Sequence, residues 1–513
     1  MFKIYNASAG SGKTTNLVIE YLTLCFKDLR KYKNILAITF TNNATAEMKS
    51  RIIQTLETFA FSEYPALNSS QKVIFNKVAE HLHLSPIEMK EKSIKLLQNI
   101  LYDYADFSIS TIDSFFQRII RAFALDIGIN LNYNLEIQLD DFYAQTIDIL
   151  LNRISKENRD LSKRVLAIVE NKMDEKGTWN IEHDLLNFMP IIYNEKSYIP
   201  LKAFEKISPE ELQTNCQKLL ENHRLLKNEI KKLAATGEEY IKESGLSEND
   251  FIGKSTGMYT WFTRFSQNID KFPLCKYFDL AVEQGSFAKN PERLSADLND
   301  KILRLYEELR DKHKMHATYG IITKNLTSLM IMVDLKLIMD EIKERDNLFY
   351  LQEANFEIYD KIKDEDAPYI YEKLGNKYGY FFIDEFQDTS EMQWANMLPL
   401  IKNALSQSYS PYENETGEVI LFGDIKQAIY RFRNGDSSLL YNLSKEEGYQ
   451  NTINPLDKDA KNFQLCNLTH NYRSAKSIIE FNNLFFKFLA GEEKIGLTFL
   501  YEYYQDVEQI IPE

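Results

Sequence analysis

Cysteine, glycine and proline are all scarce in this chain. The chain has 513 residues, which corresponds to about three domains at ~150 residues each. This length and the presence of only four cysteines exclude a small disulfide-stapled protein. The cysteines match no zinc-ligand spacing and are typical of a protein of the reducing cytosol. With 18 Gly and 12 Pro, about half of the usual ~7% and ~5%, and with 32 Phe and 30 Tyr, the composition favours long helices around an aromatic-rich interior. The cysteines are Cys25, Cys216, Cys275 and Cys466.

An excess of positive charge and a membrane-length apolar run are also missing. The net charge is −14, from 61 basic and 75 acidic residues, so the chain as a whole does not bind phosphate backbones or anionic membranes indiscriminately. A nucleic-acid site must therefore be a local patch. The most apolar later stretch, residues 329–339, is broken by Asp334 and Lys336, and the first residues are no export signal. We expect a soluble cytoplasmic protein with no membrane partner.

Short apolar runs that end in polar or glycine-containing residues predict the strands of an open α/β sheet. Three runs precede Thr111 and three follow Lys377, so the sheet domain is predicted to be interrupted. Ligands of such sheets gather beyond the carboxyl ends of the strands. The predicted strands are Phe2–Tyr5, Ile35–Phe40, Phe107–Ser110, Tyr380–Ile383, Val419–Phe422 and Phe463–Leu468.

The segment between these two groups of strands has helical periodicity. One predicted helix is capped by Ser208, has Pro209 in its first turn and ends at Gly237, and a second begins at residues 290–292. Each carries a single apolar stripe, which indicates an ordinary packed helical domain. The stripe residues are Leu212, Leu219, Leu226, Ile230 and Leu233 in the first helix and Leu294, Leu298, Leu305 and Leu309 in the second.

The sequence ASAGSGKT at Ala7–Thr14 follows a predicted strand and opens a predicted helix at Thr14–Lys27. This is the context of a phosphate-binding loop, although Ala7 stands where the strict pattern has glycine. Glycines let backbone N–H groups close on phosphates, Lys13 reaches the β and γ oxygens, and Thr14 can hold Mg²⁺. The predicted ATP-binding residues here are Ala7, Ser8, Ala9, Gly10, Ser11, Gly12, Lys13, Thr14 and Thr15.

The sequence FFIDEFQDTS at Phe381–Ser390 places two acids at the end of an apolar run. Asp384 can hold the Mg²⁺ shell together with Thr14, and Glu385 can polarise an attacking water as general base. Adjacent carboxylates are common in solvated loops. In a chain that also has a phosphate-binding loop they favour nucleotide hydrolysis.

Six motifs occur in the order found in one helicase family. Together they resemble the N-terminal half of a UvrD/Rep-type superfamily 1 DNA helicase, and the ASAG start and long helical insertion are most similar to the RecB/AddA branch, the motor subunits of helicase–nucleases. The motifs are ASAGSGKTT, ITFTNNATAEMKSRI (Ile38–Ile52), STIDSFFQRI (Ser110–Ile119), IDEFQDTS, LFGDIKQAIYRFRNGD (Leu421–Asp436) and LTHNYRS (Leu468–Ser474).

The resemblance implies an α/β fold, in which a RecA-like P-loop NTPase domain with a parallel sheet is interrupted by a large all-helical insertion. The expected divisions are 1–117 and 378–470 for the first RecA-like domain, 118–377 for the insertion, and 471–513 for the truncated start of a second RecA-like domain. The implied function is an ATP- and Mg²⁺-dependent, 3′→5′ helicase motor for DNA end processing and recombinational repair. Its implied partners are single-stranded DNA, DNA ends and a second helicase–nuclease subunit. Because no later motifs are present, the isolated fragment is expected to be nearly inactive.

The resemblance also implies roles for individual residues. Gln427 would sense the γ-phosphate, Arg473 would act as an arginine finger, and Tyr472 would stack on adenine. Aromatic rings in such motors face unstacked bases, while neighbouring polar and basic groups hold phosphates or the structure around them. For each aromatic residue the alternative is core packing. The implied DNA-binding residues are Phe40, Thr41, Asn42, Tyr430, Phe432 and Arg433.

Three positions depart from the family pattern. Asp113 replaces the usual His and places a potentially negative group near the expected DNA path, while Ala428 replaces Ser and Asn434 replaces Gly without an evident cost. Two other functions compete with the helicase. One is an ATP-binding module that docks DNA or a partner without unwinding. The other is a small-molecule kinase, in which the IYRFR and NYRS sequences would have no role.

Overall fold

The computed structural model describes residues 1–127, 133–136, 138–155, 158–176, 180–204, 207–253, 258–265, 269, 277–350, 352–362, 377–406, 416–445, 463–491 and 508–512. The chain divides into two compact units. The sheet unit contains Met1–Ile137, Tyr193–Tyr198 and Asn347–Glu513, and the helical unit contains Gln138–Ile192 and Ile199–Asp346.

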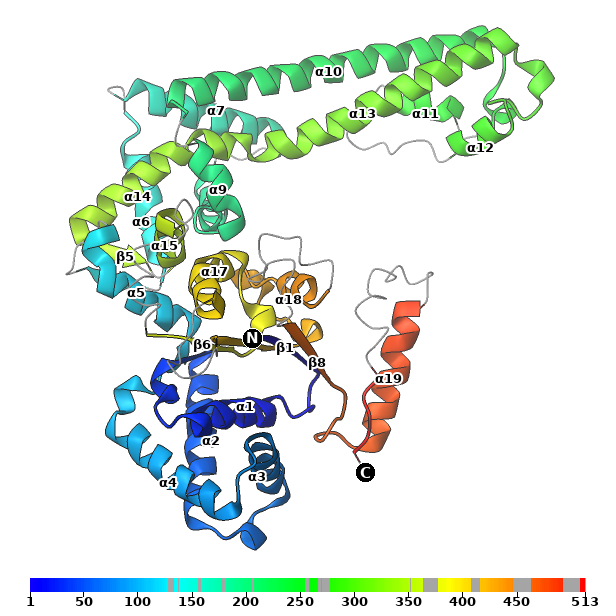
Figure 1. Cartoon of the computed structure of the whole chain (residues 1–513). Helices are drawn as coiled ribbons and strands as arrows, with labels where there is room; N and C mark the ends of the chain where they lie inside the picture. Colours follow the sequence, from blue (N-terminus) through cyan, green and yellow to red (C-terminus); the bar gives the residue numbers. More distant parts are fainter. Residues whose placement is uncertain are drawn as a thin grey trace. The chain divides into compact units, whose positions relative to one another are not determined.

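A six-stranded parallel sheet forms the centre of the sheet unit (Figure 1). All six predicted strands are present, with bounds shifted by up to two residues. In the order of the sheet, β3-β2-β6-β7-β1-β8, the strands are Ile109–Thr111, Ile35–Thr39, Tyr380–Ile383, Glu418–Gly423, Phe2–Ala7 and Phe463–Leu468. Because β1 lies between β7 and β8, the phosphate-binding loop after β1 is brought next to segments more than 400 residues later (Ile4 pairs with Leu421 and Leu465).

The central strands β2, β6 and β7 are buried almost throughout, whereas the edge strand β8 is half-buried or exposed, and the side chains of the central strands alternate between two hydrophobic cores. In β6, Phe381 and Ile383 belong to one core, and Tyr380 and Phe382 to the other. This alternation follows from the two-residue period of a strand, and it explains why the runs are continuously apolar. Helices α1 (Lys13–Lys27), α2 (Asn42–Phe61), α3 (Ser69–Leu82) and α4 (Pro86–Tyr102) supply the second core, and α5 (Ile112–Ile127), α15 (Glu353–Ile362), α17 (Glu391–Ser406) and α18 (Ser437–Ser444) supply the first.

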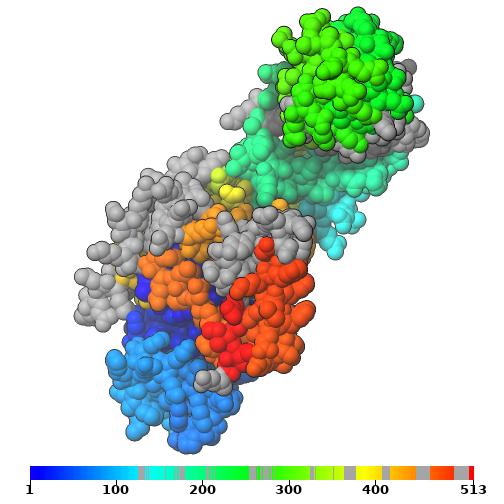
Figure 2. Space-filling model, turned by 90° about the vertical axis from the view of Figure 1, so that its right-hand side faces the viewer, coloured from blue at the N-terminus to red at the C-terminus, as the bar shows by residue number. Residues whose placement is uncertain are grey.

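The remaining elements of the sheet unit are small or peripheral. Strands β4 (Asn134–Glu136) and β5 (Leu348–Tyr350) form a separate parallel pair. Helix α19 (Lys476–Gly491) follows β8, and Asn483 on this helix donates to the Gln509 carbonyl at 3.0 Å and accepts from the Gln509 N–H at 3.1 Å. Residues 508–512 therefore lie against α19, and the two form one orange-red patch in Figure 2.

The described elements of the helical unit are helices, and the two longest, α10 (Pro209–Glu243) and α13 (Ala296–Met330), lie side by side (Figure 1). They are antiparallel, because His223 contacts His316 whereas Glu229 contacts Lys312. Their shared core contains Ile230, Phe262 and Leu309. The other helices are α6 (Asp140–Asn152), α7 (Arg159–Lys176), α8 (Glu182–Phe188), α9 (Glu195–Phe204, which begins in the sheet unit), α11 (Met258–Phe265), α12 (Phe278–Glu283) and α14 (Met332–Asp346).

Two predicted helix ends are wrong. Gly237 lies inside α10, where a β-carbon would collide with the ring of Phe262, so this glycine allows close packing and does not end the helix. Ser295, not residue 290, caps α13, since its hydroxyl accepts from the Leu298 N–H at 3.3 Å. Within the described part of the chain, no helix is long and apolar enough to cross a membrane.

Candidate active site

The loop between β1 and α1 is shaped by two glycines with left-handed backbones, Gly10 (φ +78°) and Gly12 (φ +81°). Gly10 is required for a second reason besides its positive φ: a β-carbon there would lie 2.5 Å from Asn471 Oδ1 and 2.8 Å from Arg473 Cβ. The segment after β8 rests on this loop, and the Tyr472 N–H donates to the Gly10 carbonyl at 2.9 Å. The residues that directly follow β8 are therefore part of the site around the phosphate-binding loop.

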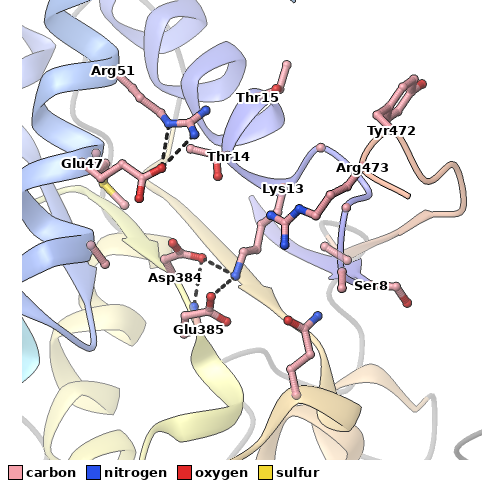
Figure 3. Close-up of a pocket in the computed structure, with 17 residues that line it drawn as sticks. Ser8, Lys13, Thr14, Thr15, Glu47, Arg51, Asp384, Glu385, Tyr472 and Arg473 are labelled. Atoms are coloured by element: carbon pink, nitrogen blue, oxygen red, sulfur yellow. Dashed lines mark hydrogen bonds and ion pairs between the residues drawn. The ribbon is translucent and has the colours of Figure 1, made fainter. Parts of the chain in front are cut away.

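Lys13, at the first position of α1, points to the carboxylates after β6 (Figure 3). Its Nζ is 3.2 Å from Asp384 Oδ1 and forms a second ion pair with Glu385. Burial opposes the charge of Lys13, but the two carboxylates outweigh it and raise the pKa of the ammonium. Burial also opposes the charge of Asp384 and raises the pKa of this carboxyl, although Lys13 acts in the opposite direction. The three charges therefore depend on one another for neutralisation.

A cavity of about 400 Å³ surrounds Lys13, which we call the Lys13 cavity. Arg473 points into it from the segment after β8, while Tyr472 points away from Lys13 and is 68% exposed (Figure 3). The structure thus brings together the sequence-predicted residues Ala7, Ser8, Ala9, Gly10, Gly12, Lys13, Thr14, Thr15, Asp384, Glu385, Gln427, Tyr472 and Arg473 around this cavity. Ser11 is 4% exposed and does not line it.

Sequence reasoning missed part of the wall, which comes from α2. Arg51 and Glu47 line the cavity with Ala44 and Met48, and the Arg51 Nε donates to Glu47 Oε1 at 2.9 Å. These four residues follow helical spacing, so they share one face of a helix that starts directly after a strand end. This helical spacing is the feature of the sequence from which the contribution of α2 to the cavity could have been predicted. Gln509 was missed as well: its Nε2 donates to the Ala9 carbonyl at 3.2 Å, and it lies too far along the sequence for any spacing to connect it with the loop.

The predicted DNA-binding aromatics meet at the carboxyl side of the sheet. The rings of Phe40 and Tyr430 have centroids 4.2 Å apart, those of Tyr430 and Phe432 are 5.9 Å apart, and the Arg433 guanidinium lies within 6 Å of both loop rings. We call these four residues the aromatic cluster. Phe432 is 78% exposed and so is not a core residue. None of the four lines the Lys13 cavity.

The other predicted DNA-binding residues and two of the departures have local structural explanations. Thr41 caps α2, because its hydroxyl accepts from the Ala44 N–H at 3.1 Å, and Asn42 is the exposed first residue of that helix. Asn434 has φ +67°, a left-handed conformation that Asn and Gly tolerate, which explains why it can replace glycine. Asp113 Oδ1 accepts from Gln393 Nε2 at 3.3 Å.

A family model described as the UvrD/REP helicase N-terminal domain matches residues 4–447. The chain belongs to this family. It is 23% identical to an ATP-dependent helicase/nuclease subunit of Lactobacillus acidophilus over 97% of the chain and 40% of that protein. It is 25% identical to the RecBCD enzyme subunit RecB of Haemophilus influenzae over 94% of the chain and 40% of that protein. The chain therefore spans about 40% of the length of these relatives.

The residues present fit the ATP and divalent cation that the UvrD/REP family implies. The Ser11 hydroxyl is buried inside the loop and has no hydrogen-bond partner among the described residues. The backbone at Gly12 is open to a ligand, because a β-carbon there would lie 3.8 Å from the nearest side chain, that of Asn16. Thr14 and Asp384 offer the hard oxygen donors that Mg²⁺ prefers. The cavity thus combines anion-binding and cation-binding groups.

Proposed function

We propose that this chain is the N-terminal motor region of an ATP-dependent DNA helicase that acts at DNA ends in repair. The observation that carries the proposal is the convergence of Lys13, two carboxylates, Gln427 and Arg473 on one cavity. In this proposal residues 1–117 and 378–470 form a RecA-like domain, 118–377 its helical insertion and 471–513 the start of a second RecA-like domain. The family match over residues 4–447 supports it.

The cavity residues suit phosphoryl transfer to water. Lys13 would exchange its carboxylate partners for phosphate oxygens, and Thr14 and Asp384 would hold Mg²⁺, which supplies charge neutralisation at the transferred group. Release from Lys13 frees the Glu385 carboxylate to orient water as general base. Arg473 would stabilise the charge that develops in the transition state, and Gln427 would report on the γ-phosphate. Tyr472, exposed at the rim, would offer its ring to adenine.

DNA binding is assigned to the aromatic cluster. Bases stack on exposed rings whatever their sequence, and Arg433 adds a positive charge for phosphate in a chain of net charge −14. Movement in the 3′→5′ direction, action in the cytoplasm and assembly with a second helicase–nuclease subunit belong to the same proposal. The names of the relatives, which describe one as part of a helicase/nuclease and the other as part of the RecBCD enzyme, support it.

Two substitutions in the full-length protein test the ATP site. Lys13→Ala should abolish nucleotide binding, because it removes the cation of the loop and leaves Asp384 and Glu385 facing the phosphates without it. Glu385→Gln should retain nucleotide binding and lower turnover on the order of 10²-fold or more, because the general base is lost. Nucleotide titration and steady-state hydrolysis separate the two effects.

The matched control is Glu391→Gln, which changes the same residue type at an exposed position in the first turn of α17. It should leave both nucleotide binding and turnover at the parental level. Hydrolysis by Glu385→Gln at the parental rate would show that Glu385 is not the base. A parental protein that binds ATP and DNA but neither hydrolyses ATP nor unwinds would instead be a docking module.

A further inference from the structure

Two buried side chains in the turn after β6 lie between the Lys13 cavity and the aromatic cluster. Gln387 is 1% exposed and Asp388 is 5% exposed, and both belong to the short 3₁₀ turn Phe386–Asp388. Neither lines the cavity. Because buried polar groups cost free energy unless they are hydrogen-bonded, the partners of these two side chains indicate their role.

Gln387 connects the proposed catalytic carboxylate to the end of β7. Its Nε2 donates to Glu385 Oε2 at 2.7 Å, and its Oε1 accepts from the Asp424 N–H at 3.1 Å. An amide has its donors on one side and its acceptor on the other, so the fixed Asp424 N–H leaves the donor side facing Glu385. Through Gln387, the backbone at the end of β7 therefore sets the direction of the Glu385 carboxylate. The backbone of Glu385 has φ +53°, a strained conformation for this residue type.

The structure makes room for this amide with a glycine. A β-carbon at Gly423, the last residue of β7, would lie 2.8 Å from Gln387 Oε1 and 2.7 Å from Leu440 Cδ2. Any side chain at this position would displace the amide or Leu440. Glycine at position 423 therefore leaves the space that the Gln387 amide occupies between Glu385 and Asp424.

Asp388 connects the same turn to the loop that carries Tyr430, Phe432 and Arg433 of the aromatic cluster. Its Oδ1 accepts from the Ile429 N–H at 3.3 Å. Farther along, the Asp436 N–H donates to the Thr389 carbonyl at 3.0 Å. The loop from Ile429 to Asp436 is therefore attached at both ends to the turn that begins with Glu385.

We propose that Gln387 and Asp388 are positioning residues through which single-stranded DNA on the aromatic cluster adjusts the carboxylate of Glu385. The inference rests on the proposed function, since it needs both ATP hydrolysis and DNA binding. The two residues are consecutive in one tight turn, so a shift of the loop that moves Asp388 also moves Gln387 and its hydrogen bond to Glu385. A misplacement of about 1 Å in a catalytic group can change a rate about 10²-fold.

The test compares Gln387→Met with Gln393→Met in the full-length protein, with an oligothymidylate as the DNA. Both positions are buried glutamines (1% and 8% exposed), and methionine has nearly the same shape, but the Gln393 side chain bonds Ser390 and Asp113 instead of Glu385. For Gln387→Met we expect kcat with DNA to fall on the order of 10-fold or more, the stimulation by DNA to fall towards 1, and the KM for ATP to stay within about 2-fold. Gln393→Met should keep the parental stimulation ratio.

Asp388→Asn gives an independent reading, because it preserves the shape of the side chain but removes its charge, and a neutral amide oxygen accepts the Ile429 N–H more weakly than a carboxylate does. It should lower the stimulation ratio with a thermal midpoint close to that of the parent, and it carries the test if Gln387→Met does not fold. Parental stimulation ratios in Gln387→Met, or in Asp388→Asn if only that variant folds, would overturn the coupling while leaving the helicase proposal intact. A parental protein without DNA-stimulated hydrolysis would overturn both.

Discussion

The Lys13 cavity and the aromatic cluster lie in the same sheet unit but differ in burial and charge. In the cavity, Asp384 and Glu385 both pair with Lys13, so removing Lys13 leaves two buried or half-buried carboxylates without the cation that neutralises them. In the cluster, Phe432 is 78% exposed and contributes a surface that solvent already reaches. Changes in the cavity should therefore act on chemistry by orders of magnitude, and changes in the cluster should act on affinity by smaller factors.

The largest difference is expected between the isolated 513-residue chain and the full-length protein. The cationic side chains that line the cavity, among the described residues, are those of Lys13, Arg51 and Arg473. A missing arginine finger lowers turnover on the order of 10³–10⁵-fold. The isolated chain should bind Mg-ATP weakly, hydrolyse it negligibly with or without single-stranded DNA, and fail to unwind duplex. Robust DNA-stimulated hydrolysis in a steady-state assay would show that Arg51 and Arg473 are sufficient.

Loss of one stacking ring should have an intermediate effect. Stacking is worth about 1–3 kcal/mol per base, so Phe432→Ala should weaken binding of single-stranded DNA about equally for all sequences. Tyr102, 90% exposed at the end of α4, supplies the control substitution Tyr102→Ala, which should leave affinity unchanged. Fluorescence anisotropy with oligonucleotides of different sequence measures both variants. Equal affinities for the two would remove Phe432 from the DNA site.

The smallest effect is expected at Thr41, which the sequence assigns to DNA and the structure to a helix cap. Loss of an N-cap costs about 1 kcal/mol, so Thr41→Ala should lower the free energy of unfolding by about that amount, and Thr41→Ser should restore it. Asn68→Ala, at the capped start of α3, should show the same loss of stability without any change in DNA affinity. A drop in DNA affinity confined to Thr41→Ala would give Thr41 both roles.

The parts that could be predicted from sequence are those governed by local patterns. The run at Tyr380–Ile383 has the predicted bounds, because a strand buried on both faces is continuously apolar. The run at Phe463–Leu468 also has the predicted bounds, although this edge strand is largely half-buried or exposed. The phosphate loop was also predictable, since glycines with positive φ have few substitutes. Gly237 was misjudged because its reason, the ring of Phe262, lies on another helix. Gln509 and the pairing of Phe40 with Tyr430 depend in the same way on contacts that no spacing encodes.

The position of β1 has a consequence for how the chain folds during synthesis. Its neighbours are β7 and β8, and the amino group of Met1 donates to the carbonyl of Gly417, 416 residues away, at 2.7 Å. At ~5–20 residues per second, ribosomes need about 20–80 s to supply that partner. During this interval the apolar side chains of Phe2 and Ile4 lack the two strands that flank β1, while the long helices α10 and α13, which pack against each other, are already complete. Nascent chains should therefore protect the helical unit from proteolysis well before they protect the phosphate-binding loop.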